Sequence, residues 1–455
     1  MIYTFKDDEN HILLDVESSS LHLVDELVFD VCNCMNKGIS KERIIALLKV
    51  KYNQEEIIEA LDELEELEKG GMFNAPSNEN ISMQDTGVIK AMCLNVAHDC
   101  NLRCNYCFAD TGEYKLGKAL MPLSVGKRAL DFLVAHSKNR KNLEVDFFGG
   151  EPLLNFEVVK SLVEYGRKLE KEFDKTIAFT MTTNALALND EIIDFCNKEL
   201  SNVVISIDGR AEVHDRVRKT ANGKGSFAYI IENAKKMAFA RQEMGKDYYI
   251  RGTYTKNNLD FYNDIMFLAD MGLEQISIEP VVLPEDDPIA ITENDLPVIN
   301  EQYTKLAKEY FARRNEQDKW FSFFHFNIDI ENGPCAAKRV SGCGAGDEYI
   351  AITPQGDIYP CHQFIGREEF IMGNVITSEF NESIRQKFKS CNITTKKDCK
   401  SCWAKYFCSG GCIANAHSFN GDIHKPYSFS CKLEKDRLKH AISLFIKEKQ
   451  LQNEV

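Results

Sequence analysis

Strand-like and helix-like segments alternate between residues 88 and 283, and this alternation limits the folds that the chain can adopt. Apolar runs of strand length begin at residues 88, 143, 176, 202, 247 and 274. Stretches of helical length separate them, for example residues 124–137 and 155–173. Six such units predict an α/β fold with a parallel sheet and right-handed crossovers, either doubly wound or rolled into a barrel or partial (β/α)6 barrel.

Residues suited to chemistry follow the first four predicted strands. Three clustered cysteines follow the first strand, Gly-Gly-Glu-Pro follows the second, Thr-Thr-Asn ends the third and Ser-Ile-Asp-Gly ends the fourth. The carboxyl ends of parallel strands lie at one edge of a sheet or barrel, where α/β proteins place their active sites. We therefore expect these four segments to meet at one reactive site.

The first 80 residues are predicted to form a separate module. Two apolar runs, MIYTF and HILLDV, flank the turn-forming DDEN, and three helical segments follow. Asn53 and Glu56 indicate a capping box at the start of the last helix, and Gly70 follows its end. This pattern resembles a winged helix. Residues 1–80 hold 7 Lys and Arg against 18 Asp and Glu, which argues against DNA binding and favours a peptide-binding module.

The length of 455 residues fits two or three domains. We predict a recognition module at 1–80, a catalytic core at 88–310, a bridging region at 311–334 and a cysteine-rich domain at 335–455. The polar segment 74–87 is predicted to be a linker. The aromatic run at 320–327 is expected to pack in the core or between domains, and a final helix is expected near residues 432–447.

Charge and hydropathy narrow the set of partners. The formal net charge is −15, with 55 Lys and Arg against 70 Asp and Glu, and a surplus of acid disfavours nucleic acid as the main partner. No run of 18 apolar residues occurs, and the N-terminus lacks the basic stretch and apolar run of a signal peptide. We therefore expect a cytoplasmic protein with no nucleic-acid or membrane partner.

The sixteen cysteines are clustered, and in a reducing cytoplasm clustered cysteines indicate metal rather than disulfides. One group is Cys100, Cys104 and Cys107. A second population in the last third of the chain comprises Cys335, Cys343, Cys361, Cys399, Cys402, Cys408, Cys412 and Cys431. The remaining five are interpreted as ordinary core or surface residues: Cys32, Cys34, Cys93, Cys196 and Cys391.

Cys100, Cys104 and Cys107 have the spacing C-x3-C-x2-C, followed by an aromatic residue. Three thiolates on one loop can hold three irons of a [4Fe-4S] cluster and leave the fourth iron open, whereas a structural zinc site has four closed ligands. The alternative is a zinc site completed by a distant His. The motif resembles that of the radical S-adenosylmethionine (SAM) enzymes. This resemblance implies that the open iron binds the amino and carboxylate groups of SAM, and that an electron from the cluster cleaves SAM to a 5′-deoxyadenosyl radical.

The same resemblance implies SAM contacts at the other strand ends. Gly149-Gly150-Glu151-Pro152 resembles the family's GGEP element, which accepts hydrogen bonds from the SAM ammonium group. Contacts to the ribose and carboxylate of SAM are implied for Thr183, Asn184, Ser206, Asp208 and Arg218, and the rings of Tyr106 and Phe108 could pack beside the adenine or shield the cluster. For Arg218 the alternative is a surface ion pair, and for the two rings it is simple packing.

The C-terminal cysteines resemble the seven-cysteine pattern of the SPASM extension, which carries two auxiliary [4Fe-4S] clusters. The resemblance implies a distal cluster held by Cys399, Cys402, Cys408 and Cys431, and a cluster nearer to SAM held by Cys343, Cys361 and Cys412. The nearer cluster is then one ligand short, and either Cys335 or a substrate thiolate could complete it. A zinc ribbon could explain Cys399, Cys402, Cys408 and Cys412 alone, but it leaves the other three cysteines without a role.

SPASM enzymes mostly modify ribosomally made peptides, and the acidic N-terminal module resembles the element with which several peptide maturases bind a leader peptide. Sulfatase-type maturases carry an Asp where this chain has His362, so formylglycine formation is disfavoured. The chain most resembles the clostridial thioether-forming maturases of six-cysteine (SCIFF) peptides. The resemblance implies a peptide thioether synthase that needs SAM, three [4Fe-4S] clusters and a flavodoxin or ferredoxin reductant. The alternative is another SPASM reaction on a peptide: carbon-carbon cross-linking, epimerisation, decarboxylation or sulfatase-type oxidation.

Overall fold

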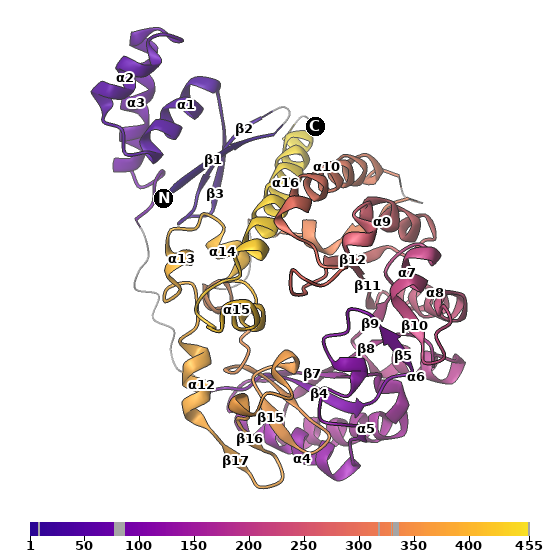
Figure 1. Ribbon diagram of the computed structural model, residues 1–455. Helices are drawn as coiled ribbons and strands as arrows, with labels where there is room; N and C mark the ends of the chain where they lie inside the picture. Colours follow the sequence, from indigo (N-terminus) through magenta and orange to yellow (C-terminus); the bar gives the residue numbers. More distant parts are fainter. Residues whose placement is uncertain (8–9, 77–86, 317–318, 329, 331–335, 454–455) are drawn as a thin grey trace.

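The computed structural model describes residues 1–7, 10–76, 87–316, 319–328, 330 and 336–453. Its centre is a parallel sheet of six strands that carry the predicted apolar runs, with helices on the outer side (Figure 1). In spatial order the strands are β4 (Ala91–His98), β7 (Asn142–Gly149), β8 (Thr176–Thr183), β9 (Asn202–Ser206), β11 (Asp247–Tyr254) and β12 (Gln275–Pro280). The alternating pattern predicted both the six strands and their parallel pairing, and the structure confirms both.

Amphipathic helices cover this sheet because their apolar residues recur at helical spacing. On α5, for example, the buried positions are Val159, Leu162, Val163, Gly166 and Leu169. The helices of the core are α4 (Leu123–His136), α5 (Phe156–Phe173), α6 (Asp190–Glu199), α7 (Ala211–Val217), α8 (Phe227–Glu243), α9 (Phe261–Asp270) and α10 (Leu296–Arg313). Short elements complete it: β5 (Leu102–Cys104), β6 (Ala119–Leu120), β10 (Arg218–Thr220), β13 (Ser322–Phe323), η1 (Asp110–Gly112), η2 (Pro152–Asn155), η3 (Lys256–Asn258), η4 (Glu293–Asp295) and η5 (Phe324–Phe326).

The N-terminal residues form a three-stranded antiparallel sheet and three helices. The elements are β1 (Ile2–Lys6), β2 (His11–Asp15), β3 (Ser20–Val24), α1 (Glu26–Asn36), α2 (Lys41–Leu48) and α3 (Gln54–Lys69). The hairpin and the three helices match the prediction from the sequence, whereas β3 was not predicted. Successive side chains of a strand point to opposite faces, so Leu13 packs against the helices while Ile12 and Leu14 pack against Trp403 and Leu438 of the C-terminal region. Strand β2 is therefore buried on both faces of the small sheet.

The C-terminal region continues the central sheet. Strand β14 (Tyr349–Ile352) pairs in parallel with β4, and β15 (Asp357–Tyr359), β16 (Gly373–Asn374) and β17 (Glu379–Phe380) follow as an antiparallel extension. The helices here are α11 (Ala336–Ser341), α12 (Glu382–Lys389), α13 (Lys397–Lys400), α14 (Lys405–Cys408), α15 (Ile413–Asn420), α16 (Ser428–Asn453), η6 (His362–Phe364) and η7 (Glu368–Phe370). Because β14 lies beside β4, the segment that contains Cys361 packs close to the loop that contains Cys107.

Two further expectations can be compared with the fold. Within the aromatic run 320–327, Phe321, Phe323 and Phe326 are buried in the main core, which confirms its packing role. The final helix, α16, is longer than predicted and packs along α10 (Figure 1). In the described part of the chain, no helix combines the length and the apolar character needed to cross a membrane.

Candidate functional site

Cys100, Cys104 and Cys107 line one cavity of about 140 Å³ at the carboxyl ends of the central strands. Burial raises the pKa of the Cys100 thiol to about 12 and that of Cys104 to about 11, and the neighbouring thiols add to both shifts. Strand β5 pairs with β10 so that Cys104 lies opposite Arg218, whose charge lowers the pKa of Cys104. The three thiols are therefore held together in a partly buried, water-poor setting.

Residues from the other three strand ends line the same cavity, as the sequence analysis expected of them. The cavity wall includes Gly149, Gly150, Glu151, Thr183, Asn184, Ser206 and Arg218, together with Tyr106 and Phe108. Two of these positions require glycine. A Cβ atom on Gly149 would lie 2.3 Å from the carbonyl oxygen of Ala97, and one on Gly150 would lie 2.1 Å from that of Asp99. The chain can therefore pass close to the cysteine loop only without side chains here.

Glu151 is 1% exposed, and three donors of the protein bind its carboxylate. Oε1 accepts from the backbone N–H of Leu153 at 3.1 Å and from the hydroxyl of Thr183 at 2.8 Å. Oε2 accepts from the backbone N–H of Asn184 at 2.8 Å. Burial raises the pKa of Glu151 to about 7 in spite of these bonds. The side chain of Asn184 donates to Asn101 at 2.7 Å and lies 3.5 Å from the Cys100 sulfur.

Arg218 is not a surface residue, so the surface ion pair considered from the sequence is wrong. Its side chain is 11% exposed and donates from Nε to Asp208 Oδ1 at 3.0 Å. Asp208 is fully buried and also accepts from the hydroxyl of Tyr106 at 2.6 Å and from the backbone N–H of Thr253 at 3.0 Å. Asp208 does not line the cavity. It binds Arg218 and Tyr106, and both of these residues do line it.

The predicted nearer and distal cysteines form two groups in the structure. Cys343, Cys361 and Cys412 are close enough that each of Cys343 and Cys412 raises the pKa of Cys361, which burial raises most. Cys399, Cys402, Cys408 and Cys431 form the second group, in which burial and the three other thiols raise the pKa of Cys408 to about 12. Cys335 lies outside the described residues.

A larger cavity of about 620 Å³ is bordered both by these cysteines and by the central parallel sheet and its helices, which we call the barrel. Cys343 and Cys412 of the nearer group line it, as do Cys408 and Cys431 of the distal group. Its opposite wall includes Glu279 from the end of β12 and Arg437 from α16. Two cysteine groups therefore face a space large enough for side chains of a bound peptide.

Two family models match the chain. The model described as a 4Fe-4S single cluster domain matches residues 86–232, and the SPASM model, described as an iron-sulfur cluster-binding domain, matches residues 343–403. The cysteine-type anaerobic sulfatase-maturating enzyme of Clostridium novyi is 25% identical over 336 residues, which cover 70% of this chain and 86% of that enzyme. The chain is therefore similar to the SPASM-domain radical SAM maturases.

Solved structures share the fold of this chain. The structure of anSMEcpe with bound AdoMet and Cp18Cys peptide has a TM-score of 0.64 at 17% identity, covering 81% of this chain and 100% of that one. Streptococcus suis SuiB bound to precursor peptide SuiA has a TM-score of 0.53 at 17% identity, covering 93% and 97%. These likenesses show an α/β radical SAM fold with a mostly parallel sheet and a C-terminal SPASM domain.

The donor set of the chain fits iron-sulfur clusters better than single metal ions. Within the described ranges, no three His, Cys, Asp or Glu side chains converge closely enough to hold one ion. The wall of the 140 Å³ cavity contains three cysteines but no His and no fourth Cys. Three thiols spread around a cavity, rather than meeting at a point, suit the corners of a cluster with one iron left open.

Sequence reasoning named His362 and Phe108 but missed Phe148, which the structure brings into contact with His362. His362 stacks on Phe148 at 4.9 Å between ring centroids and lies 5.4 Å from the ring of Phe108. Its Nδ1 lies 3.4 Å from the hydroxyl of Tyr349, and burial lowers its pKa to about 4. Phe148 directly precedes the Gly149-Gly150 pair, and this position was the signal available in the sequence. Phe148, Cys107 and Cys361 pack against the same small core cluster.

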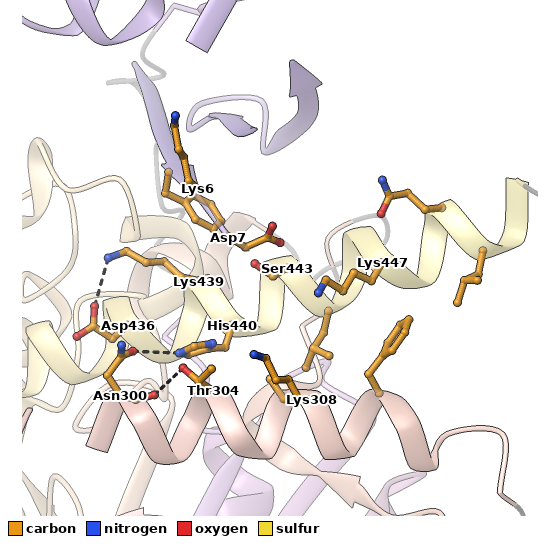
Figure 2. Close-up of a pocket in the computed structure, with 16 residues that line it drawn as sticks. Lys6, Asp7, Asn300, Thr304, Lys308, Asp436, Lys439, His440, Ser443 and Lys447 are labelled. Carbon is orange, nitrogen blue, oxygen red and sulfur yellow. Dashed lines mark hydrogen bonds and ion pairs between the residues drawn. The ribbon is translucent and has the colours of Figure 1, made fainter. Parts of the chain in front are cut away.

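Another cavity, of about 840 Å³, lies away from the cysteines. It is formed by the end of β1, by α10 and by α16, and residues such as Lys308, Lys447 and His440 line it (Figure 2). Asn300 of α10 and His440 of α16 are hydrogen-bonded at 3.0 Å across its floor. None of the sequence-predicted site residues borders this cavity. This cavity therefore results from the packing of the N-terminal sheet on α10 and α16 and is separate from the cysteine sites.

Proposed function

We propose that this radical SAM chain forms an intramolecular thioether, joining a Cys sulfur to a carbon of an acceptor residue, in a ribosomally made cysteine-rich precursor peptide. The observation that carries the proposal is the 620 Å³ cavity, because Cys343 and Cys412 of the three-cysteine nearer group border it. A cluster held by three protein thiols has room for a thiolate of the substrate, whose pKa such binding lowers.

Domain roles follow from the same proposal. Residues 1–80 would recognise the precursor, 88–310 would form the radical SAM core, 311–334 would bridge, and 335–455 would hold two auxiliary clusters. In the described part of the chain β3 pairs only with β2, so its second edge can take an added strand. A leader peptide that binds there by strand addition would be oriented by backbone hydrogen bonds. A flavodoxin or ferredoxin would supply the electron.

The residues of the first cavity have definite tasks in this mechanism. Cys100, Cys104 and Cys107 would hold a [4Fe-4S] cluster which, with SAM, supplies a carbon radical. The Arg218 guanidinium, fixed by Asp208, lines the cavity where an anionic group of SAM can be bound in two-point fashion. The ring of Tyr106 lies beneath that guanidinium, with 5.5 Å between the ring centroid and the guanidinium carbon. Glu151 and Asn184 order the strand ends that complete the wall.

A second candidate is sulfatase-type oxidation of a Cys or Ser side chain. It is favoured by the similarity to the Clostridium novyi enzyme. It is disfavoured by His362, which stands where the sulfatase-type maturases carry an Asp base and is itself a weak base because burial among aromatic rings lowers its pKa to about 4. The two reactions differ in product: a thioether keeps the sulfur and removes two hydrogens, whereas oxidation of Cys to an aldehyde removes the sulfur.

The test is an anaerobic incubation of the iron-loaded protein with SAM, dithionite and a cysteine-rich precursor peptide, read by mass spectrometry. Loss of two hydrogens, with one Cys no longer open to alkylation, supports thioether formation. Loss of sulfur identifies the oxidation instead. Absence of 5′-deoxyadenosine from protein with full iron and sulfide content contradicts the radical SAM assignment of the proposal.

A further inference from the structure

A basic segment runs past the distal cysteines of an otherwise acidic chain. Residues 385–405 contain seven Lys and Arg and a single Asp, although the chain as a whole has a formal net charge of −15. The segment spans most of α12, all of α13 and the start of α14, and it includes Cys399 and Cys402. A local charge of this sign needs a specific explanation, because the acidic surplus elsewhere already provides solubility.

Several of these cations have structural partners. Arg385 binds Asp347 at 2.9 Å, and Lys405 binds the buried Glu17 at 2.6 Å. Lys396 is 1% exposed and donates from Nζ to the carbonyl oxygen of Gly410 at 2.7 Å. These three side chains therefore hold the C-terminal region together and are not available to a partner protein.

Three other lysines surround the distal cysteines without such partners. Lys397 and Lys400 begin and end α13, on either side of Cys399, and both are exposed. Lys435 lies one turn after Cys431 on α16; burial raises the pKa of the Cys431 thiol, and the charge of Lys435 opposes that rise. None of the three forms an ion pair with any residue that the structure describes. We name Lys397, Lys400 and Lys435 the distal lysine patch.

We propose that the distal lysine patch is the docking surface for a small, acidic one-electron carrier of the flavodoxin or ferredoxin class. The inference rests on the proposed function, because it needs an iron-sulfur cluster on Cys399, Cys402, Cys408 and Cys431. Electron-transfer complexes have small interfaces and depend on complementary charge for their rate of association. Lysines around the distal cysteines would attract an acidic carrier to the cluster with which it exchanges an electron.

The electron balance of the proposed reaction explains why such a surface is useful. Thioether formation breaks one S–H and one C–H bond and makes one S–C bond. One hydrogen atom leaves in 5′-deoxyadenosine, the other leaves as a proton, and one electron is released. Reductive cleavage of SAM consumes one electron. The carrier therefore donates one electron and its oxidised form accepts one per turnover, and the distal cysteines are the exit for the second electron.

The position of the patch favours a carrier over the precursor peptide. A peptide substrate has to reach the cavity bordered by Cys343 and Cys412, which lies between the barrel and the SPASM region. Helix α13, by contrast, lies on the side of the SPASM region that faces away from the barrel (Figure 1). A partner bound there would leave the substrate cavity open.

The test compares Lys397→Glu/Lys400→Glu with a matched control. Lys168 and Lys171 have the same spacing and are likewise exposed, but lie on α5 of the barrel, so Lys168→Glu/Lys171→Glu changes net charge equally. Each iron-loaded protein is reduced with dithionite, freed of excess reductant and mixed with an oxidised acidic flavodoxin, without SAM or peptide. Stopped-flow absorbance then gives the second-order rate constant at low and high salt.

We expect the α13 variant to lose about tenfold or more of the rate at low salt and most of the salt dependence, while the α5 variant retains both. SAM cleavage driven by dithionite should be unchanged in both variants. An unchanged flavodoxin rate in the α13 variant overturns the proposal, as does an equal loss of rate in the control. The milder Lys397→Gln/Lys400→Gln variant repeats the test if the double Glu variant binds less iron. Low iron content or lack of SAM cleavage in the unmodified protein would instead contradict the proposed function.

Discussion

Arg218 and Asp208 form a buried ion pair, with 3.0 Å between Nε and Oδ1 and side-chain exposures of 11% and 0%. Desolvation makes a buried pair costly to break, because the remaining charge has no water to replace its partner. The same Asp208 carboxylate binds the hydroxyl of Tyr106. One carboxylate therefore fixes two walls of the cavity that contains Cys100, Cys104 and Cys107.

Asp208→Asn should weaken both the fold and SAM binding. The substitution leaves the Arg218 charge without its counter-charge, and loss of one partner of a buried pair costs about 3–5 kcal/mol. We expect a lower midpoint of unfolding and a higher Kd for SAM, measured by denaturation and equilibrium dialysis. Asp190→Asn is the control, since the Asp190 side chain is 82% exposed and its pair with Lys236 lies at the surface. Equal effects of the two substitutions would contradict this account.

Gly150→Ala should abolish SAM cleavage. The added Cβ would lie 2.1 Å from the carbonyl oxygen of Asp99, and backbone atoms on both sides leave no flexible side chain to move away. The strand end must then shift from the cysteine loop, and the cavity between them loses its shape. The measurement is 5′-deoxyadenosine formed with dithionite as reductant. Gly70→Ala is the control, because Gly70 has φ −75° and its nearest contacts lie at 3.4 Å; it should retain activity.

Lys405→Met should loosen the N-terminal sheet from the SPASM region. Lys405 and Glu17 are 9% and 2% exposed and bind at 2.6 Å across 388 residues of sequence. Without the cation, the Glu17 carboxylate keeps the hydroxyl of Tyr406 but loses its counter-charge, a change worth about 3–5 kcal/mol. Hydrogen exchange in β2 and β3 should become faster. Lys69→Met breaks only the exposed pair with Glu65 and should leave these rates unchanged.

Local patterns predicted the parts of the fold that are stabilised locally. The six strands are apolar runs between turn residues, and α3 begins after Asn53 and ends before Gly70 as predicted. The predicted capping box differs in one detail. It requires the Asn53 side chain to accept from the N–H of Glu56, but in the structure this side chain accepts from the N–H of Glu55. Strand β3 escaped prediction because Ser20–Val24 is short and none of its residues is buried in the core.

Roles that depend on distant parts of the chain could not be predicted. Asp208 was predicted to contact SAM because of its position in the motif. Only the structure shows that the Asp208 carboxylate binds Tyr106, Arg218 and Thr253. The pairing of Lys405 with Glu17 and the stacking of His362 on Phe148 likewise join segments far apart in sequence. A sequence lists such residues without indicating which of them meet.

Asp146 gives a pH dependence of stability that one substitution should remove. The side chain is half-buried on β7, and burial raises its pKa from 3.8 to about 6 although the hydroxyl of Thr180 donates to it at 2.8 Å. The folded chain then keeps this proton up to about pH 6, whereas the unfolded chain loses it near pH 4. Because the folded state binds more protons in this range, the free energy of unfolding falls as pH rises through it.

The Asp146→Asn variant keeps an acceptor for the Thr180 hydroxyl but has no carboxyl that titrates. The pH-dependent contribution of Asp146 to the free energy of unfolding is therefore absent from it. Relative to the variant, the native chain should lose about 1.4 kcal/mol of unfolding free energy between about pH 5 and about pH 7, one pKa unit's worth of binding energy. Urea titrations of both proteins across this range give the difference directly. Glu144→Gln, on the same strand but at an exposed position, controls for the change in net charge. Parallel stability curves for the native chain and Asp146→Asn would mean that Asp146 ionises as freely in the folded state as in the unfolded chain.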